Sequence, residues 1–307
     1  MTTAYITHHD CRLHDMGPDH PECPDRLDAI NDRLIAAGLD IYLQHHDAPL
    51  AEMAHLLRVH PRSYVEQLQD SAPGHGIVHL DPDTVMSPGT LRAALRAAGA
   101  GVLGVDLVMK GEASNAFCAV RPPGHHAERA RAMGFCFFNN IAVAAGHALE
   151  AWGLERVAIV DFDVHHGNGT ENIFSGHPRV LMVGSFQHPF YPYSGTDHPA
   201  ANMCNVPLPA GTRGDAFRDM VADLWLPRLN AFAPQLVLIS AGFDAHCEDD
   251  MASLGLVEND YAWVTTQLKT LAETHAGGRI VSMLEGGYAL SALGRSAAAH
   301  IKVLAGL

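Results

Sequence analysis

The feature that most constrains the fold of this chain is a series of short apolar runs that lack polar alternation. A run such as Val157-Ala158-Ile159-Val160 has no polar face, so a strand formed by it must be covered on both sides. Helical stretches separate several of these runs. This alternation predicts an α/β fold with an open, mostly parallel sheet and helices on both faces. The expected strands are 115–120, 156–163, 179–185, 235–241 and 279–284, and the expected helices are 139–152, 215–231 and 258–276.

The composition of the chain fits one large globular domain. Hydrophobic residues make up 48% of the 307 positions and charged residues 18%, which excludes a disordered acidic chain. No repeat, low-complexity tract or Pro/Ser linker divides the sequence, so we expect residues 1–307 to form a single domain. The most apolar long segment, 91–109, is interrupted by charged residues and predicts an Ala/Gly-rich packed helix.

The charge and the cysteines limit the partners and the compartment. A formal charge of −14 argues against a nucleic-acid partner, which would need a basic patch. No apolar run approaches the roughly 18 residues of a membrane span, and residues 1–10 do not resemble a secretory signal. Six scattered cysteines form no metal or disulfide pattern. We therefore expect a cytoplasmic protein without a membrane partner that acts on a small molecule or peptide; a homo-oligomer is left open.

Four of the apolar runs end in polar, Gly-rich segments. In parallel sheets, ligands bind beyond the carboxyl ends of the strands, so these segments form one site if their strands are neighbours. The segments are Arg-Pro-Pro-Gly-His-His at 121–126, Asp-Phe-Asp-Val-His-His-Gly-Asn-Gly at 161–169, Ser-Ala-Gly-Phe-Asp-Ala-His at 240–246 and Glu-Gly-Gly-Tyr at 285–288.

Asp161, Asp163 and His165 are spaced two residues apart, so on an extended segment they point the same way. Neighbouring buried carboxylates repel unless a cation or hydrogen-bond donors compensate them. Asp and His together suit zinc, iron or cobalt better than calcium or magnesium. Asp244 ends another buried strand and is a candidate third ligand, which would leave a coordination position open for water. A polar turn at 161–165 and a helix-capping role for Asp244 are the structural alternatives.

His125 and His126 each need a partner that fixes the imidazole tautomer, and Asp161 and Asn168 are the nearest polar candidates. Tyr288 follows two glycines and could donate a hydrogen bond to an oxyanion, or it could pack in the core. Assembled, these residues predict hydrolysis of an amide or ester by a metal-activated water, with a histidine as general base and acid.

These motifs are long and occur in a fixed order, and through them the chain resembles the histone deacetylase family. It is more similar to the class II and bacterial histone-deacetylase-like amidohydrolases than to class I. The resemblance runs from His20-Pro21-Glu22 to Tyr288 and so covers nearly the whole chain. It implies an arginase/deacetylase-like fold and one Zn²⁺ per chain, held by Asp163, His165 and Asp244. It also implies a deacetylase that removes acyl groups from acylated lysine or similar amines.

The resemblance also implies roles for the polar residues around the metal. His126 matches the general base and acid, and His125 matches its electrostatic partner. Asp161 and Asn168 match the residues that hydrogen-bond the two histidines, Asn168 being the class II choice where class I has Asp. Tyr288 matches the catalytic tyrosine, which some class II members replace with His.

The acyl-lysine tunnel of the family has matches at Gly134, Phe135 and Tyr191, although a second Phe would be more usual than Tyr191. Seven residues after Asp244, Met251 stands where polyamine-specific eukaryotic relatives carry a gatekeeper Glu. That difference disfavours one mode of polyamine recognition. The acidic residues at 248–250 keep a cationic substrate open.

The family also binds structural K⁺ through carbonyl groups of the segment 161–165 and a neighbouring strand. The family usually has Ser at the position of Gly184 and His at the position of Phe186. This departure removes the hydroxyl ligand of the inner K⁺ site unless Ser185 substitutes for it.

Three other functions compete with a zinc deacylase of acyl-lysine. The first, an acetylpolyamine amidohydrolase using the same site, remains open. A binuclear manganese ureohydrolase of the arginase kind would need a further carboxylate two residues after His165, where this chain has Gly167. A non-catalytic binding module would be indicated by the loss of a ligand or of Tyr288, but all of these residues are present.

Overall fold

The computed structural model describes residues 2–307 and is built around one parallel sheet of eight strands, in the order β2-β1-β5-β10-β9-β6-β7-β8. This confirms the predicted α/β fold with a mostly parallel sheet. The strands are β1 Thr3–Thr7, β2 Leu43–Asp47, β5 Asn115–Cys118, β6 Val157–Asp161, β7 Val180–Gln187, β8 Met203–Leu208, β9 Leu236–Ala241 and β10 Ile280–Leu284.

The five strands expected from continuous apolar runs all form, at β5, β6, β7, β9 and β10, and every one of their residues is buried. The strand order makes β5, β10, β9 and β6 consecutive neighbours. Because they are parallel, the four polar segments that follow them leave the sheet at the same edge. The predicted convergence of these segments is therefore confirmed.

Three strands of the sheet, β1, β2 and β8, were not expected. Strand β2 lies at one edge of the sheet, where its Leu-Gln-His-His-Asp sequence is largely exposed. Strand β8 lies at the other edge and contains Pro207, which a central strand would not tolerate. Edge strands need apolar residues on fewer sides, so β2 and β8 lack the continuous apolar signal. Strand β1 lies inside the sheet between β2 and β5, but threonines at both of its ends leave only a short apolar run.

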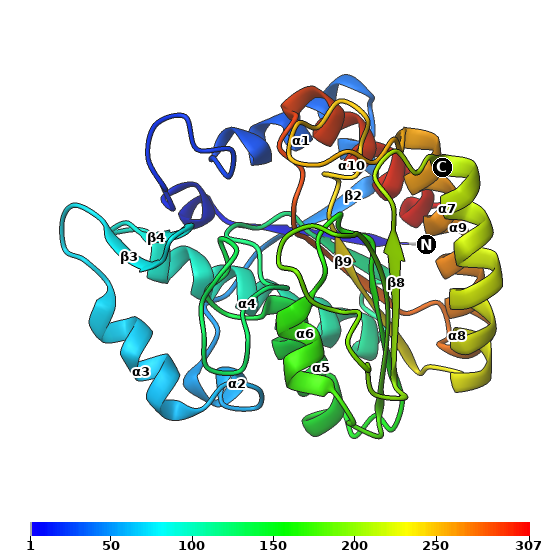
Figure 1. Cartoon of the computed structure of the whole chain (residues 1–307), viewed down its shortest axis with the longest axis horizontal. Coiled ribbons are helices and arrows are strands. Elements are labelled where there is room, and N and C mark those ends of the chain that lie inside the picture. The colour runs from blue at the N-terminus through cyan, green and yellow to red at the C-terminus, as the bar shows by residue number, and fades with distance from the viewer. Residues whose placement is uncertain (1) are drawn as a thin grey trace.

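Helices cover both faces of the sheet (Figure 1). Helices α4 and α5 pack against one face, and α1, α9 and α10 pack together on the other. The segment expected at 91–109 is α4, whose Gly101 and Gly104 lie directly against Met283 and Val281 of β10. The helices are α1 Asp25–Ala36, α2 Met53–Leu56, α3 Arg62–Ser71, α4 Thr90–Lys110, α5 Asn140–Glu150, α6 Asn168–Phe174, α7 Gly214–Met220, α8 Leu226–Phe232, α9 Glu258–His275 and α10 Leu290–Ala305.

The single regular helix expected at 215–231 is wrong in detail. A π-helical turn at Val221–Trp225 separates α7 from α8. Pro227 lies in the first turn of α8 and has no N–H to donate to the preceding turn, and the wider turn accommodates that loss. Hydrophobic side chains from Ala4 to Leu304 form one continuous core cluster. None of the helices within residues 2–307 combines the length and the apolar character needed to cross a bilayer.

A separate antiparallel hairpin, β3 Val78–Asp81 and β4 Thr84–Met86, stands beside the sheet. It holds the segment of Gly134 and Phe135, because the Asp83 carboxylate accepts the N–H of Gly134 at 3.1 Å and the Thr84 hydroxyl accepts the N–H of Phe135 at 3.1 Å. The six cysteines of the chain are free thiols.

Candidate active site

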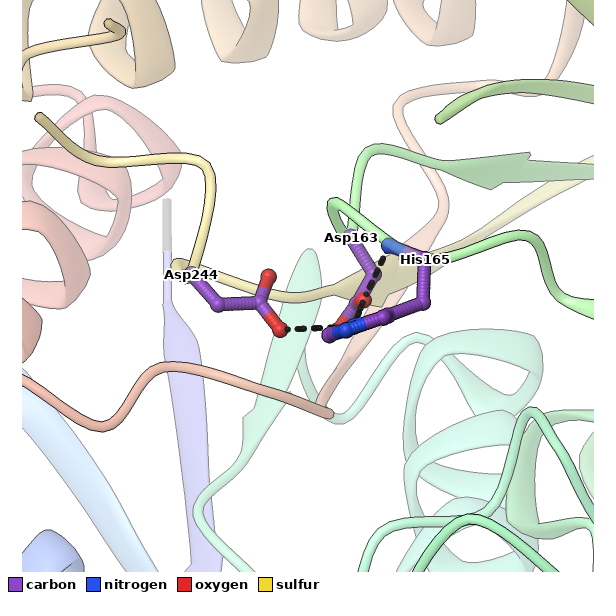
Figure 2. Close-up of side chains that lie close together, drawn as sticks. All are labelled: Asp163, His165 and Asp244. Carbon is purple, nitrogen blue, oxygen red and sulfur yellow. Dashed lines mark hydrogen bonds and ion pairs between the residues drawn. The ribbon is translucent and has the colours of Figure 1, made fainter. Parts of the chain in front are cut away.

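Three candidate metal ligands meet beyond the carboxyl ends of β6 and β9. Figure 2 shows Asp244, on the loop after β9, reaching towards Asp163 and His165 on the loop after β6. Nδ1 of His165 lies 3.0 Å from Oδ1 of Asp163 and 3.2 Å from Oδ2 of Asp244. One possible ligand atom from each residue lies within 4.8 Å of those from the other two, and all three side chains are buried. The structure thus brings together the three residues predicted from the sequence.

The neighbouring backbone holds these carboxylates in place. Oδ2 of Asp163 accepts the N–H of Gly286 at 2.8 Å, and Oδ1 of Asp244 accepts the N–H of Val164 at 3.0 Å. A side chain at position 286 would collide with both carboxylates, so only glycine permits this approach. Oδ2 of Asp244 is buried, and within residues 2–307 its polar partner is the ion-pair contact with Nδ1 of His165 at 3.2 Å.

The electrostatics of the three residues fit a cation. Burial raises the pKa of Asp244 to about 6, and repulsion from Asp163 adds to this effect. Burial alone would lower the pKa of His165, but Asp163 and Asp244 raise it to about 9. The two carboxylates therefore stabilise positive charge between them. A metal ion bound to Asp244, Asp163 and Nδ1 of His165 would supply that charge and replace the proton of His165.

Asp161 does not belong to this group, which corrects the expectation that Asp161, Asp163 and His165 point the same way. Strand β6 ends at Asp161, and the chain turns beyond it. Oδ1 of Asp161 accepts the N–H of Asp163 at 3.1 Å, while Oδ2 lies 2.9 Å from Nδ1 of His125. Asp161 therefore partners His125, and the period of two holds only for Asp163 and His165.

His125 and His126 are packed ring to ring, with centroids 4.1 Å apart, in the segment after β5. Burial alone would lower the pKa of His125, but the carboxylates of Asp163 and Asp161 raise it well above its usual range. Burial lowers the pKa of His126 well below its usual range, and the positive charges of His125 and His165 lower it further. The surroundings therefore favour the protonated form of His125 and the neutral form of His126.

A hydrogen-bond chain fixes the tautomer of His126. Nδ1 of His126 donates to Oδ1 of Asn168 at 2.7 Å, and Nδ2 of Asn168 donates to Oε1 of Glu128 at 2.9 Å. Glu128 thereby orients the amide so that its oxygen faces the imidazole. With Nδ1 protonated, Nε2 of His126 carries the free lone pair and can accept a proton.

His125, His126 and His165 line a pocket of about 220 Å³ whose walls contain both polar and aromatic side chains. All four residues that the resemblance places around the substrate line the pocket, namely Gly134, Phe135, Tyr191 and Met251. A side chain at position 134, where φ is 58°, would collide with the His126 imidazole. The complete lining is Asp83, Pro123, His125, His126, Gly134, Phe135, His165, Phe190, Tyr191, Met251, Gly286 and Tyr288.

Tyr288 reaches this pocket from the turn after β10. Burial raises the pKa of its phenol well above the usual range, so the hydroxyl stays protonated and can donate. The phenol makes no hydrogen bond with any group in residues 2–307, and it lies in the wall of the pocket rather than in the core.

A buried cluster of charged side chains contacts the turn that carries Tyr288. Nε of Arg26 donates to the carbonyl oxygen of Gly287 at 2.6 Å, and its guanidinium lies 4.9 Å from the centre of the Tyr288 ring. Arg26 is paired with Glu22 at 3.0 Å, and Glu22 also binds Arg121 through both carboxylate oxygens. All three charged side chains are completely buried.

Several functional neighbours were missed from the sequence. Phe190 stacks on His165 at 5.5 Å and lines the pocket next to Tyr191, so the aromatic wall has a Phe as well as a Tyr on this side. Glu285 accepts the N–H groups of Gly124 and His125 at 2.7 and 3.1 Å and so fixes the turn that carries His125 and His126, called here the histidine turn. A charged residue directly after a buried strand was the available signal for Glu285; Phe190 had none beyond its position next to Tyr191.

Position 184 lies beside the segment that the resemblance connects with K⁺. Gly184 pairs with Asp161 across β6 and β7, and a Cβ there would lie 3.6 Å from the Asp161 carbonyl oxygen. A serine would therefore fit and would place a hydroxyl near that carbonyl. Ser185 is the next residue along β7, and because side chains alternate it faces the other side of the sheet. The K⁺ site remains a prediction.

Comparison with known proteins gives the family. Residues 20–304 match the histone deacetylase domain. The chain belongs to the histone deacetylase family. It is 40% identical over 279 residues to a histone deacetylase-like amidohydrolase of Pseudomonas aeruginosa, which covers 88% of this chain and 72% of that protein. It is 36% identical over 333 residues to polyamine deacetylase HDAC10 of Homo sapiens, which covers 100% of this chain and 48% of that protein.

The fold agrees with this assignment. The solved HDA15 HD domain matches with a TM-score of 0.93 and 35% sequence identity, and the match covers 100% of this chain and 89% of that one. The predicted deacetylase-like fold and family are thus confirmed, and this histone deacetylase family member is a hydrolase that acts on amide bonds.

Proposed function

We propose that the chain is a zinc-dependent deacetylase that removes acyl groups from acylated lysine side chains or closely related amines. The observation that carries this proposal is the set of Asp163, His165 and Asp244 beside a small pocket with aromatic walls. A pocket of about 220 Å³ suits an extended acyl-amine chain rather than a folded domain. In the same pocket a neutral histidine and an unpartnered phenol provide a base and a hydrogen-bond donor.

Zinc fits the ligand set, since two carboxylates and one imidazole leave a position open in a four-coordinate site. When bound, Zn²⁺ lowers the pKa of water and polarises a carbonyl oxygen. The neutral imidazole of His126 holds Nε2 ready to take a proton and later return it to the leaving amine. The hydrogen bond to Asp161 favours the protonated form of His125, which would stabilise negative charge developing in the pocket. The Tyr288 phenol donates a hydrogen bond to the substrate oxygen.

Acetylated polyamines are a second candidate substrate class. The human relative named above is a polyamine deacetylase, and the Asp83 carboxylate lines the pocket of this chain, where it could face a cationic amine. Met251 also lines the pocket and contributes no carboxylate. We favour acyl-lysine because a Met side chain in the wall recognises aliphatic atoms rather than a second ammonium group.

Metal content and turnover test the proposal together. Purified protein should contain about one zinc per chain by elemental analysis and should hydrolyse an acetyl-lysine amide faster than an acetylated polyamine. Asp244→Ala should lose the metal and the activity, because the remaining two ligands hold zinc poorly. Asp250→Ala is the matched control, since Asp250 is exposed and lies outside the ligand group.

Two metals per site, or full metal retention by Asp244→Ala, would contradict the ligand assignment. Turnover of acetylated polyamines with no turnover of acetyl-lysine amides would move the proposal to the second substrate class. Loss of metal without loss of turnover would remove the metal from the reaction.

A further inference from the structure

A buried carboxylate outside the proposed catalytic set joins two loops of the site. Asp249 lies on the loop after β9, five residues beyond Asp244, and its relative exposure is 5%. No arginine, lysine or histidine forms an ion pair with it anywhere in residues 2–307. A buried carboxylate without a cationic partner is unfavourable unless hydrogen-bond donors satisfy its oxygens.

Three backbone N–H groups satisfy Asp249. Oδ2 accepts the N–H groups of Tyr288 and Ala289 at 2.6 and 2.9 Å. Oδ1 accepts the N–H of Met251 at 3.0 Å. One side chain therefore ties the loop after β9 to the turn after β10, which are separated by about 40 residues in the sequence.

Both loops contribute walls to the same pocket, through Met251 and Tyr288. The Tyr288 turn contains Gly286 and Gly287, and two adjacent glycines have little conformational stiffness of their own. Gly287 has a φ of 119°, so the turn depends on external contacts to hold its shape. Arg26 binds the carbonyl side of this turn, at Gly287, and Asp249 binds the N–H side, at Tyr288.

We propose that Asp249 is a positioning residue for amide hydrolysis, which holds the Tyr288 phenol at the place where the substrate oxygen gains negative charge. It does not touch the substrate, and it acts through the backbone of Tyr288. This inference rests on the proposed role of Tyr288 in hydrolysis.

The geometry demands a carboxylate at this position. The three N–H donors approach two separate oxygens, and an asparagine offers only one oxygen. In Asp249→Asn, an amide NH₂ that faces Tyr288 and Ala289 removes the acceptor of both N–H groups. When it faces Met251 instead, the remaining hydrogen bonds to Tyr288 and Ala289 come to a neutral amide oxygen, which accepts more weakly than a carboxylate, so the turn is held less firmly in either orientation. Asp250→Asn is the matched control, because it removes the same charge from an exposed neighbour.

The test is a double-mutant cycle on a zinc-loaded enzyme of measured metal content, with an acetyl-lysine amide as substrate. Asp249→Asn should lower kcat by about 10- to 100-fold. It cannot exceed the roughly 10²- to 10³-fold contribution of the phenol itself if it acts through Tyr288. In the Tyr288→Phe background, Asp249→Asn should change kcat by less than about twofold, because the donor that it positions is gone. Asp250→Asn should leave kcat unchanged in both backgrounds.

Hydrogen–deuterium exchange of the segment 285–290 provides a readout that needs no activity. The Tyr288 and Ala289 amides should be protected in the wild type, and Asp249→Asn should speed their exchange while Asp250→Asn should not. Rapid exchange of these amides in the wild type itself would overturn the contact, even if Asp249→Asn failed to fold.

The outcomes separate the two proposals. If Asp249→Asn lowered kcat equally in the wild-type and Tyr288→Phe backgrounds, its role would be generally structural and the positioning inference would be overturned. A wild type that loads zinc but hydrolyses no acyl amine would overturn the proposed function, and with it any positioning for hydrolysis. The exchange result would then still decide whether Asp249 holds the turn.

Discussion

The buried ion cluster below the Tyr288 turn makes a sharp prediction for Glu22→Gln. Glu22 is completely buried and binds two guanidinium groups, those of Arg26 and Arg121, which are themselves completely buried. The substitution keeps the shape of the side chain and removes its charge, so it leaves two buried cations without a counter-charge. Removing one partner of a buried ion pair costs about 3–5 kcal/mol of stability.

This cost translates into a measurable change in melting temperature. The unfolding entropy of a chain of 307 residues is about 0.6 kcal/mol per kelvin, so Tm should fall by about 5–8 °C. The matched control is Glu66→Gln in the exposed i,i+4 pair with Arg62, where the N–O distance is 3.6 Å. Exposed pairs contribute less than about 1 kcal/mol, so the control should hardly change Tm.

The same reasoning fixes the sign of the pH dependence. Burial alone would raise the pKa of Glu22, but Arg121, His14 and Arg26 hold it well below its usual range. A carboxyl group with a depressed folded pKa stabilises the protein above its unfolded pKa of about 4.3, and this contribution is lost as the pH falls through the folded pKa. The stability difference between wild type and Glu22→Gln should therefore persist from pH 7 to pH 5 and shrink below about pH 4.

Urea unfolding followed by circular dichroism, with thermal melts at pH 7, 5 and 3.5, measures these effects. A loss for Glu22→Gln no larger than that for Glu66→Gln would refute the argument that the buried cluster needs its charge. A difference that grew as the pH fell would refute the assigned sign.

Three further predictions concern the Tyr288 phenol, K⁺ binding near Gly184 and the organisation of the chain as one domain. Tyr288→Phe should keep fold and zinc and lower kcat on an acetyl-lysine amide by about 10²- to 10³-fold, with a smaller change in KM; steady-state kinetics check this, and a trifluoroacetyl amide should lose less. Gly184→Ser should fold normally, since 3.6 Å leaves room for its Cβ, and should lower the K⁺ concentration that gives half-maximal activity in a salt titration; an unchanged titration would argue against K⁺ binding there. Limited proteolysis should give no independently folded halves, because one core cluster connects Ala4 with Leu304; two stable fragments would contradict a single domain.

Much of the fold could be predicted because a central parallel strand carries a strong signal. Runs such as 157–160 are apolar at every position, and that pattern is stable only between two covering layers. The edge strands β2 and β8 are partly exposed, so their sequences do not show the continuous apolar pattern that predicts a strand. The π-helical turn at Val221–Trp225 depends on how one proline is accommodated, which periodicity does not reveal.

Those residues of the candidate site that closely follow an apolar strand could be predicted from the sequence. Asp163, His165 and Asp244 were found because carboxylates after apolar strands need a cation. Asp249 and Glu128 were not, because each acts through contacts with residues about 40 positions away, which only the folded chain brings close. Asp161 hydrogen-bonds His125, in line with its predicted role, but its side chain does not point with those of Asp163 and His165, because β6 ends at Asp161 and the sequence does not show that end.

The position of β10 has a consequence for how the site comes into existence. This strand begins at residue 280, yet it lies in the middle of the sheet, between β5 and β9. During synthesis, β1, β2 and β5 emerge early, and β6 to β9 follow, but the two groups share no hydrogen-bonded edge until β10 inserts between them. Such non-local pairing is slow and leaves strand edges exposed. Until β10 has emerged from the ribosome, nothing in the sheet therefore holds His125 and His126, after β5, beside the proposed zinc ligands after β6 and β9. The site is complete only once residues up to Tyr288 have left the ribosome.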